Sequence, residues 1–99
     1  MPPHQKPFVS INPTLPGFKH CLEKLAPENR ELAKQAMRDL MLPEIPAKYR
    51  FKRLTGHYSQ NLFTITFGQN DEYKMSMAII NGVAILRRAG PDKEIDEIP

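Results

Sequence analysis

The second half of the chain alternates between hydrophobic and polar positions. Hydrophobic and polar side chains alternate at every step within residues 63–67 and 73–77, and the larger apolar side chains keep that period as far as Ile79. A period of two indicates half-buried β-strands. Asn81-Gly82 follows at once, and this dipeptide favours the two-residue type I′ turn of a β-hairpin because both positions tolerate a positive φ. Residues 83–89 form the returning strand. The pattern therefore predicts a three-stranded antiparallel meander.

The first half shows the spacing of amphipathic helices instead. Within residues 15–25 the apolar side chains recur at intervals of 3, 4 and 3 residues and so share one face. A second helix is predicted from Pro27 to Leu42, with Pro43 ending it. Its apolar stripe consists of Leu32, Ala33, Ala36, Met37 and Leu40. Residues 8–11 are predicted to form a short strand ahead of this αα-hairpin.

These elements predict an α+β fold, in which an N-terminal short strand and an αα-hairpin pack on an antiparallel β-meander. The 99 residues suit one domain around one core. Residues 1–7, with three of the ten prolines, and the acidic residues 92–99 are predicted to be flexible tails.

The two-residue turn also predicts the register of the hairpin. It places Ser76 opposite Arg87, Met75 opposite Arg88 and Lys74 opposite Ala89. Lys74 and Arg87 then become diagonal neighbours on the face away from the helices, within reach of one shared phosphate group. The alternative interpretation is that both cations only solubilise an uncovered face.

The charge is distributed unevenly along the chain. The formal net charge is +3, but four acidic residues and one lysine after Gly90 give that segment −3, which leaves +6 on residues 1–90. A basic body favours an anionic partner such as RNA, DNA or an acidic protein segment. A solvated surface with a loose acidic tail would give the same numbers.

Several classes of protein are disfavoured by composition. Cys21 is the single cysteine, so neither an intrachain disulfide nor a zinc site with two or more cysteines can form. A helix needs about 18 consecutive apolar residues to span a bilayer, and no apolar run in the chain approaches that length. The N-terminus also lacks the apolar core of a signal peptide. We therefore expect a cytoplasmic protein without a membrane partner.

The order and spacing of four segments resemble the second half of toxins of the RelE/ParE superfamily. The segments are residues 51–58, 61–67, 73–77 and 81–90. They are similar to the family's lysine-x-leucine-x-glycine turn, its leucine-tyrosine-x-isoleucine-arginine strand, its tyrosine-arginine-isoleucine strand and its final strand. The resemblance implies a RelE-like fold and a type II toxin–antitoxin system, with a cognate antitoxin protein as partner. RelE-like members are ribonucleases that cut mRNA on the ribosome without a metal ion, whereas ParE-like members inhibit DNA gyrase.

Candidate site residues follow from this resemblance together with the charge pattern. Lys74 matches the arginine of the tyrosine-arginine strand, Lys93 lies near a basic position of some members, and His57 has an intrinsic pKa suited to a general base. A surface role for His57 is the alternative. Thr64 and Thr66 stand where the family has basic residues, and Pro91-Asp92 where a histidine is common. The catalytic candidates are Lys74, Arg87, Lys93 and His57, and the RNA-binding candidates are Lys48, Arg50, Lys52, Arg53 and Arg88.

The sequence thus predicts a ribosome-dependent mRNA endoribonuclease (an mRNA interferase) that inhibits translation with no metal and no small-molecule cofactor. One alternative is a non-catalytic or ParE-like member of the same fold that acts by binding gyrase or its antitoxin. Another is a small basic nucleic-acid-binding protein with no toxic role. A further hypothesis is that the acidic tail folds over the basic face and competes with RNA.

Overall fold

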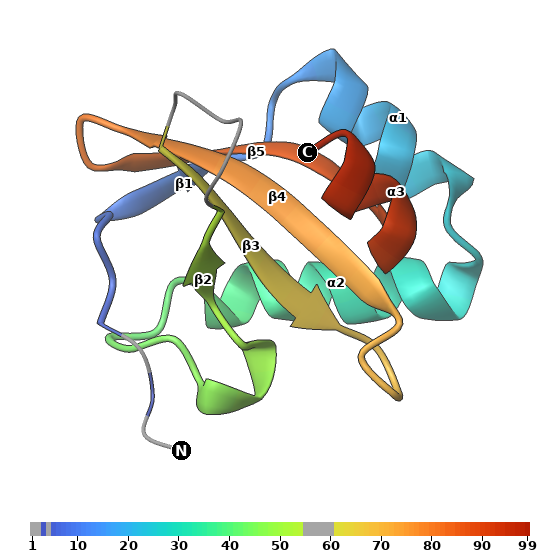
Figure 1. Ribbon diagram of the computed structural model, residues 1–99, viewed down its shortest axis with the longest axis horizontal. Helices are drawn as coiled ribbons and strands as arrows, with labels where there is room; N and C mark the ends of the chain where they lie inside the picture. Colours follow the sequence, from blue (N-terminus) through green and yellow to red (C-terminus); the bar gives the residue numbers. More distant parts are fainter. Residues whose placement is uncertain (1–2, 4, 55–60) are drawn as a thin grey trace.

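The structure is a computed structural model that describes residues 3, 5–54 and 61–99 of the chain. Within these ranges a five-stranded mixed sheet carries three α-helices and one short 3-10 helix (Figure 1). The predicted α+β class is confirmed. The strands are β1 Ser10–Asn12, β2 Lys52–Arg53, β3 Leu62–Phe67, β4 Tyr73–Ile80 and β5 Val83–Pro91, in the sheet order β1-β5-β4-β3-β2. The helices are α1 Pro16–Lys24, α2 Pro27–Asp39, η1 Ala47–Tyr49 and α3 Asp92–Glu97.

The central strands form the predicted meander. β3 pairs antiparallel with β4, and β4 pairs antiparallel with β5. Asn81 and Gly82 connect β4 and β5 with φ values of 52° and 77°, as the hairpin turn requires. The N-terminal strand makes the sheet mixed, because β1 runs parallel to β5 with Ser10 opposite Val83. This strand begins at Ser10 rather than at Phe8, whose side chain is buried in the core instead.

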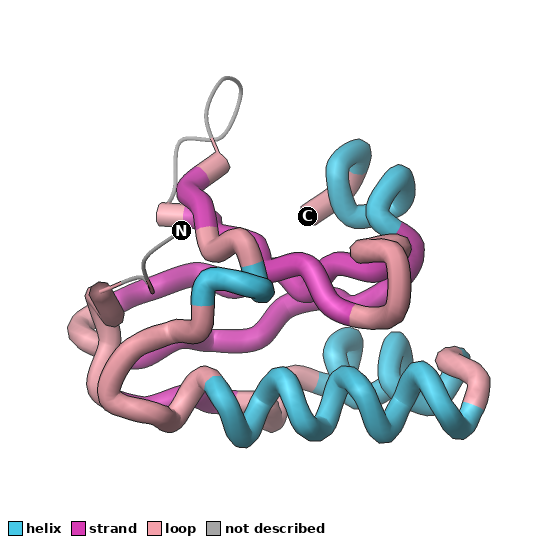
Figure 2. The backbone as a smooth tube through the Cα atoms, turned by 90° about the horizontal axis from the view of Figure 1, so that it is seen from below, coloured by secondary structure: helices cyan, strands magenta, loops and turns pink. Residues whose placement is uncertain are grey.

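Helices α1 and α2 cover one face of the sheet (Figure 2). Each starts at a proline in its first turn, where the missing N–H needs no partner. Phe18 from α1 and Ala36 from α2 are fully buried. The main core lies between these helices and the sheet residues on the same face, which are Ile65, Phe67, Met75, Met77, Ile79, Ala84, Leu86 and Ala89. α2 ends at Asp39, three residues before the predicted Leu42.

A β-bulge corrects the predicted register. The pairs nearest the turn are as predicted, but the register shifts between Ser76 and Met77. Beyond that point Ser76 lies opposite Arg88, Met75 opposite Ala89 and Lys74 opposite Gly90, so the three predicted pairings there were wrong. The physical reason is burial: in the regular register Arg88 would lie opposite the fully buried Met75, whereas the bulge places Ala89 there.

The acidic end of the chain is a helix rather than the expected flexible tail. α3 packs against β4 and β5, on the face opposite α1 and α2 (Figure 2). Its Ile95 side chain is fully buried, and Pro99 is buried as well. Burial of these apolar side chains outweighs the charge of the segment. In the other predicted tail, Lys6 donates a hydrogen bond to the Leu40 carbonyl oxygen at 3.2 Å.

Candidate functional site

A row of four polar side chains crosses the sheet on the face that α1 and α2 leave open. Lys52 of β2 lies opposite Thr64 of β3, Thr64 opposite Ser76 of β4, and Ser76 opposite Arg88 of β5. Opposite residues share a face, so the row places two hydroxyls between two cations. Both hydroxyl residues are buried, with Thr64 1% and Ser76 0% exposed. The row is therefore part of a packed surface.

Three cations gather around Ser76. Arg88 is its cross-strand neighbour, and Lys74 stands two residues earlier on the same face of β4. Arg87, the extra residue at the bulge, reaches the same region, because its Nε and the Ser76 hydroxyl both donate to the Pro99 carbonyl oxygen. We call these four residues, Lys74, Ser76, Arg87 and Arg88, the Ser76 cluster.

The C-terminal segment of the described chain contacts every member of the Ser76 cluster. Lys74 Nζ lies 2.7 Å from Asp96 Oδ1. Arg88 Nη1 donates to the Ile98 carbonyl oxygen at 2.9 Å. The Pro99 carbonyl oxygen accepts from Ser76 Oγ at 3.2 Å and from Arg87 Nε at 3.4 Å. The hypothesis that the acidic segment folds over the basic face thus agrees with the contacts, while competition with RNA stays a prediction.

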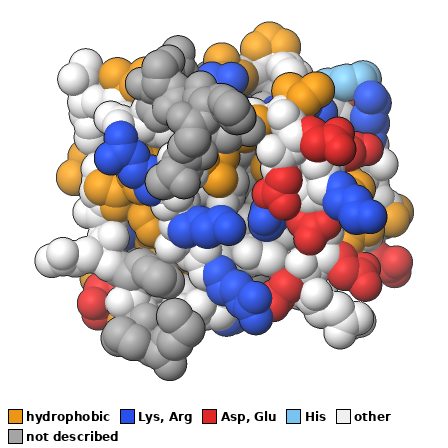
Figure 3. Space-filling model, in the orientation of Figure 1, with side chains coloured by type: hydrophobic (Ala, Val, Ile, Leu, Met, Phe, Trp, Pro, Cys, Tyr) orange, Lys and Arg blue, Asp and Glu red, His pale blue; other side chains and the backbone are white. Residues whose placement is uncertain are grey.

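The surface view shows how the charges are arranged on this face. In Figure 3, Lys and Arg side chains spread across the middle of the face, and Asp and Glu side chains gather beside them over α3. The Lys74 side chain is only 12% exposed, since Asp96 lies next to it. The basic surface is therefore partly screened by the acidic helix.

The basic residues of segment 48–53 have different surroundings in the structure. Arg50 has a left-handed backbone with φ 48°, and its side chain pairs with Asp71 at 3.1 Å. Arg53 donates to the Asn61 side-chain oxygen at 3.0 Å. Lys52, by contrast, belongs to the polar row. Of the RNA-binding candidates, Lys52 and Arg88 share the row, whereas Arg50 and Arg53 have local partners.

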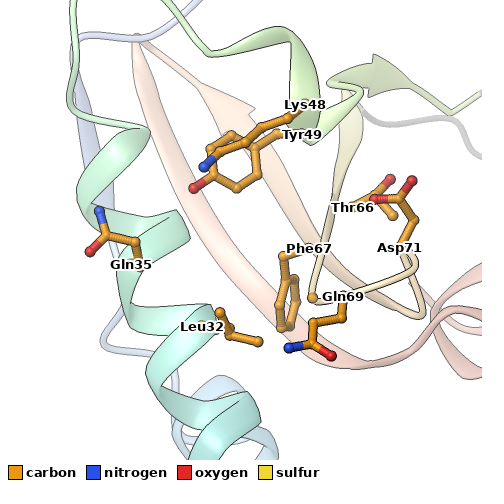
Figure 4. A pocket seen from close by; sticks show the side chains of 9 residues that line it. Leu32, Gln35, Lys48, Tyr49, Thr66, Phe67, Gln69 and Asp71 are labelled. Atoms are coloured by element: carbon orange, nitrogen blue, oxygen red, sulfur yellow. The ribbon is translucent and has the colours of Figure 1, made fainter.

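Lys48 lines a separate cavity of about 210 Å³. Figure 4 shows this cavity between Gln35 of α2, the η1 residues and the end of β3. The Tyr49 hydroxyl donates a hydrogen bond to the Asp39 carboxylate. Burial, helped by that bond and by the negative charge of Asp39, raises the pKa of Tyr49 well above its ordinary value. Tyr49 therefore stays protonated near neutral pH and cannot serve there as a general base.

The two remaining catalytic candidates are not brought into the Ser76 cluster by a described contact. Lys93 is exposed on α3, and its side chain makes no hydrogen bond or ion pair with another described residue. His57 lies outside the described residues. His20 is described, but it is exposed on α1, on the other side of the sheet.

The Ser76 cluster can bind a phosphate group. Arginine and lysine supply hydrogen-bond donors and positive charge for phosphate oxygens, both in a bound ligand and in a phosphoryl transition state. Cleavage by the RNA 2′-OH also needs a proton acceptor, which lysine and arginine in their charged forms are not. The cluster thus offers hydrogen-bond donors and positive charge for a phosphate, but no proton acceptor.

Sequence reasoning missed Ser76 as a site residue. The alternation of β4 already placed it on the same face as Lys74, so that signal was available. Its association with both arginines depends on the bulge and on residues 98–99, which no short-range pattern indicates.

Among the described residues, no group of three or more His, Cys, Asp or Glu side chains is placed to hold a metal ion. No helix in those ranges has the length and apolar character needed to cross a membrane.

Comparison of the chain with protein-family models, with curated proteins and with solved structures gives no match.

Proposed function

We propose that the protein is the toxin of a type II toxin–antitoxin system with a RelE-like fold, acting in the cytoplasm as a ribosome-dependent, metal-independent mRNA endoribonuclease. The observation that carries the proposal is the Ser76 cluster, in which Lys74, Arg87 and Arg88 converge on one buried serine. Three cations on one side of a sheet suit the phosphodiester backbone of a single RNA strand. The resemblance of residues 51–90 to RelE-like toxins supports the same target.

The roles of the cluster follow from its chemistry. Arg87 and Arg88 present planar guanidinium groups that can hold two oxygens of one phosphate. Lys74 adds a point charge beside them, and Lys52 extends the polar row along the path of the strand. In this proposal the cations stabilise the charge that develops on the phosphate during attack by the 2′-OH. His57 is the candidate for the proton acceptor.

The direct test is inducible expression without an antitoxin, with growth and ribosome-bound mRNA followed together. The wild-type chain is expected to stop growth and to cut mRNA. The double variant Lys74→Ala/Arg87→Ala is expected to lose about 100-fold or more of the cleavage rate, because two charge-stabilising donors are removed. A matched control is Lys19→Ala/Lys34→Ala, which removes the same charge from the two helices on the other face. A double cluster variant that remained fully toxic would overturn the assignment of the site.

The second candidate is a non-catalytic or ParE-like protein of the same fold. Thr64 and Thr66 favour it, since they bring no charge to the open face at positions where the family has basic residues. Purified protein that inhibits gyrase supercoiling yet leaves ribosome-bound mRNA intact would select this candidate. Cleavage of that mRNA with gyrase unaffected would reject it.

The proposal includes an antitoxin, and one surface has suitable chemistry for it. An open apolar groove is lined by Ile11 of β1 and by Met37 and Met41 at the end of α2, with Lys34 and Arg38 at its side. Such a groove suits an amphipathic protein segment with acidic side chains. If a neighbouring gene encodes the antitoxin, the two proteins are expected to co-purify. Met41→Asp should weaken that complex, and unchanged affinity would reject the groove as the binding surface.

A further inference from the structure

The Ser76 cluster is already occupied by oxygen atoms of the protein itself. The carbonyl oxygens of two successive residues, Ile98 and Pro99, accept hydrogen bonds from Arg88, Arg87 and Ser76. The Ser76 side chain is fully buried, so its hydroxyl donates to the Pro99 oxygen and has no access to solvent. A buried donor and two guanidinium groups that converge on a pair of oxygens resemble the environment that proteins provide for oxyanions.

We infer that Ser76, Arg87 and Arg88 form a phosphate subsite for the RNA backbone, and that residues 96–99 occupy it as an internal competitor. This inference rests on the proposed function, because it names how the same site holds its substrate and how access to it is limited. The carbonyl oxygens of Ile98 and Pro99 stand in for phosphate oxygens.

The charge at this contact favours replacement by a phosphate. Lys74, Arg87 and Arg88 contribute three positive charges, and the side chains of the covering segment that reach them provide one carboxylate, that of Asp96. A phosphodiester brings a formal negative charge to Arg88, where the Ile98 carbonyl oxygen brings only a dipole. RNA therefore gains more at Arg88 than the protein's own segment does.

The covering segment can leave while the start of α3 stays docked on the sheet. Its anchor is Ile95, which is 0% exposed and precedes the contacts with the cluster. Two of the three residues that make those contacts are exposed, since the Asp96 side chain is 49% and Ile98 66% exposed, while Pro99 is buried. An ion pair with one exposed partner is weak and is screened by salt. Displacement of residues 96–99 would open the end of α3 and expose Pro99, while Ile95 keeps the start of the helix docked.

The test measures binding of a short single-stranded RNA oligonucleotide by fluorescence anisotropy at low salt. Asp96→Asn removes the attraction to Lys74 and keeps the shape of the side chain, so affinity is expected to rise about twofold to fivefold. Glu97→Gln is the matched control, since it makes the same charge change one residue later on α3, at an exposed side chain with no described ion pair. Equal gains for the two variants would overturn the masking by residues 96–99.

The subsite itself is tested by Ser76→Ala, which removes one hydroxyl from a buried position. Affinity for the oligonucleotide is expected to fall about tenfold, with circular dichroism and thermal unfolding showing that the fold is kept. Arg87→Lys gives a second variant that keeps the charge and loses the planar fork, and it should also bind more weakly. Wild-type affinity in both variants would overturn the subsite.

Binding and cleavage separate this inference from the proposed activity. Affinities that follow the expected order, in a protein that leaves ribosome-bound mRNA uncut, would support the subsite and reject the endoribonuclease. Cleavage that is unaffected by Ser76→Ala and by Asp96→Asn, with unchanged RNA affinities, would reject the inference and leave the endoribonuclease standing.

Discussion

Ser76 lies opposite Arg88 rather than Arg87, because a β-bulge interrupts the pairing of β4 with β5 between Ser76 and Met77. The bulge lets the side chains of both Arg87 and Arg88 lie near Ser76, while Ala89 takes the buried position opposite Met75. In a regular ladder, successive side chains alternate between faces, and two adjacent arginines could not both serve one site.

The bulge predicts an unusual tolerance to deletion. Removal of Arg87 should give a regular ladder in which Arg88 still faces Ser76 and Ala89 still faces Met75. Removal of Ile85 should instead place Leu86 opposite Ala78 and Arg87 opposite the fully buried Met77, because the turn fixes the pairs beside it. We expect the Arg87 deletion to fold and unfold cooperatively and the Ile85 deletion to be insoluble or unfolded. Soluble expression and thermal unfolding check this, and equal loss of folding in both would contradict it.

The raised pKa of Tyr49 leads to a prediction about the stability of the protein at high pH. Its pKa lies above the ordinary 10.0, so the folded state favours the protonated hydroxyl. The resulting stabilisation is present in full below about pH 10 and is lost as the pH rises above that value. Tyr49→Phe should lower the free energy of unfolding by about 1–2 kcal/mol at neutral pH, through loss of the bond to Asp39.

The difference between wild type and Tyr49→Phe should shrink above pH 10. Urea unfolding at several pH values measures it. The comparison with the variant removes the effect of other groups that titrate in that range. A difference that grew with pH would show that the sign is wrong.

The salt dependence of RNA binding should report the number of phosphate contacts. Each cation that neutralises a phosphate of a single strand contributes about 0.7 to the slope of log affinity against log salt. Arg88→Ala is therefore expected to reduce the slope by about 0.7, because Arg88 belongs to the phosphate subsite. Lys19→Ala, an exposed cation on α1, should leave the slope unchanged. Equal slopes for wild type and Arg88→Ala would place Arg88 outside the RNA interface.

Ile95 should carry most of the docking of α3. Its side chain is fully buried and lies outside the main core, whereas Ile98 is 66% exposed. Ile95→Ala is expected to lower the free energy of unfolding by about 2–4 kcal/mol, and Ile98→Ala to change it by no more than about 0.5 kcal/mol. Chemical denaturation of the two variants measures the contrast. Similar values for both would mean that the helix is held by its polar contacts instead.

Much of the fold could be predicted because its signals are local. The alternation in residues 73–80, the Asn81-Gly82 turn and the apolar stripe of α2 each depend on neighbours a few positions apart, and the corresponding elements are present. Local signals were weaker at the ends of elements, where the strand predicted at Phe8 begins at Ser10. Hydrophobic burial of Phe8 decided that boundary, and burial depends on the whole fold.

The candidate site, like the fold, was predictable only in those features that depend on residues close together in the sequence. The amino-acid sequence by itself determined the α+β class, the meander, the uneven charge and the placement of Lys74 on the face away from the helices. Only the tertiary structure decided that Ser76, Arg87 and Arg88 converge, that Arg50 and Arg53 have other partners, and that residues 96–99 cover the cluster. The reason is that a bulge and a docked helix gain their free energy from burying Ala89 and Ile95 against strands distant in sequence, which the periodicity of a single segment does not contain.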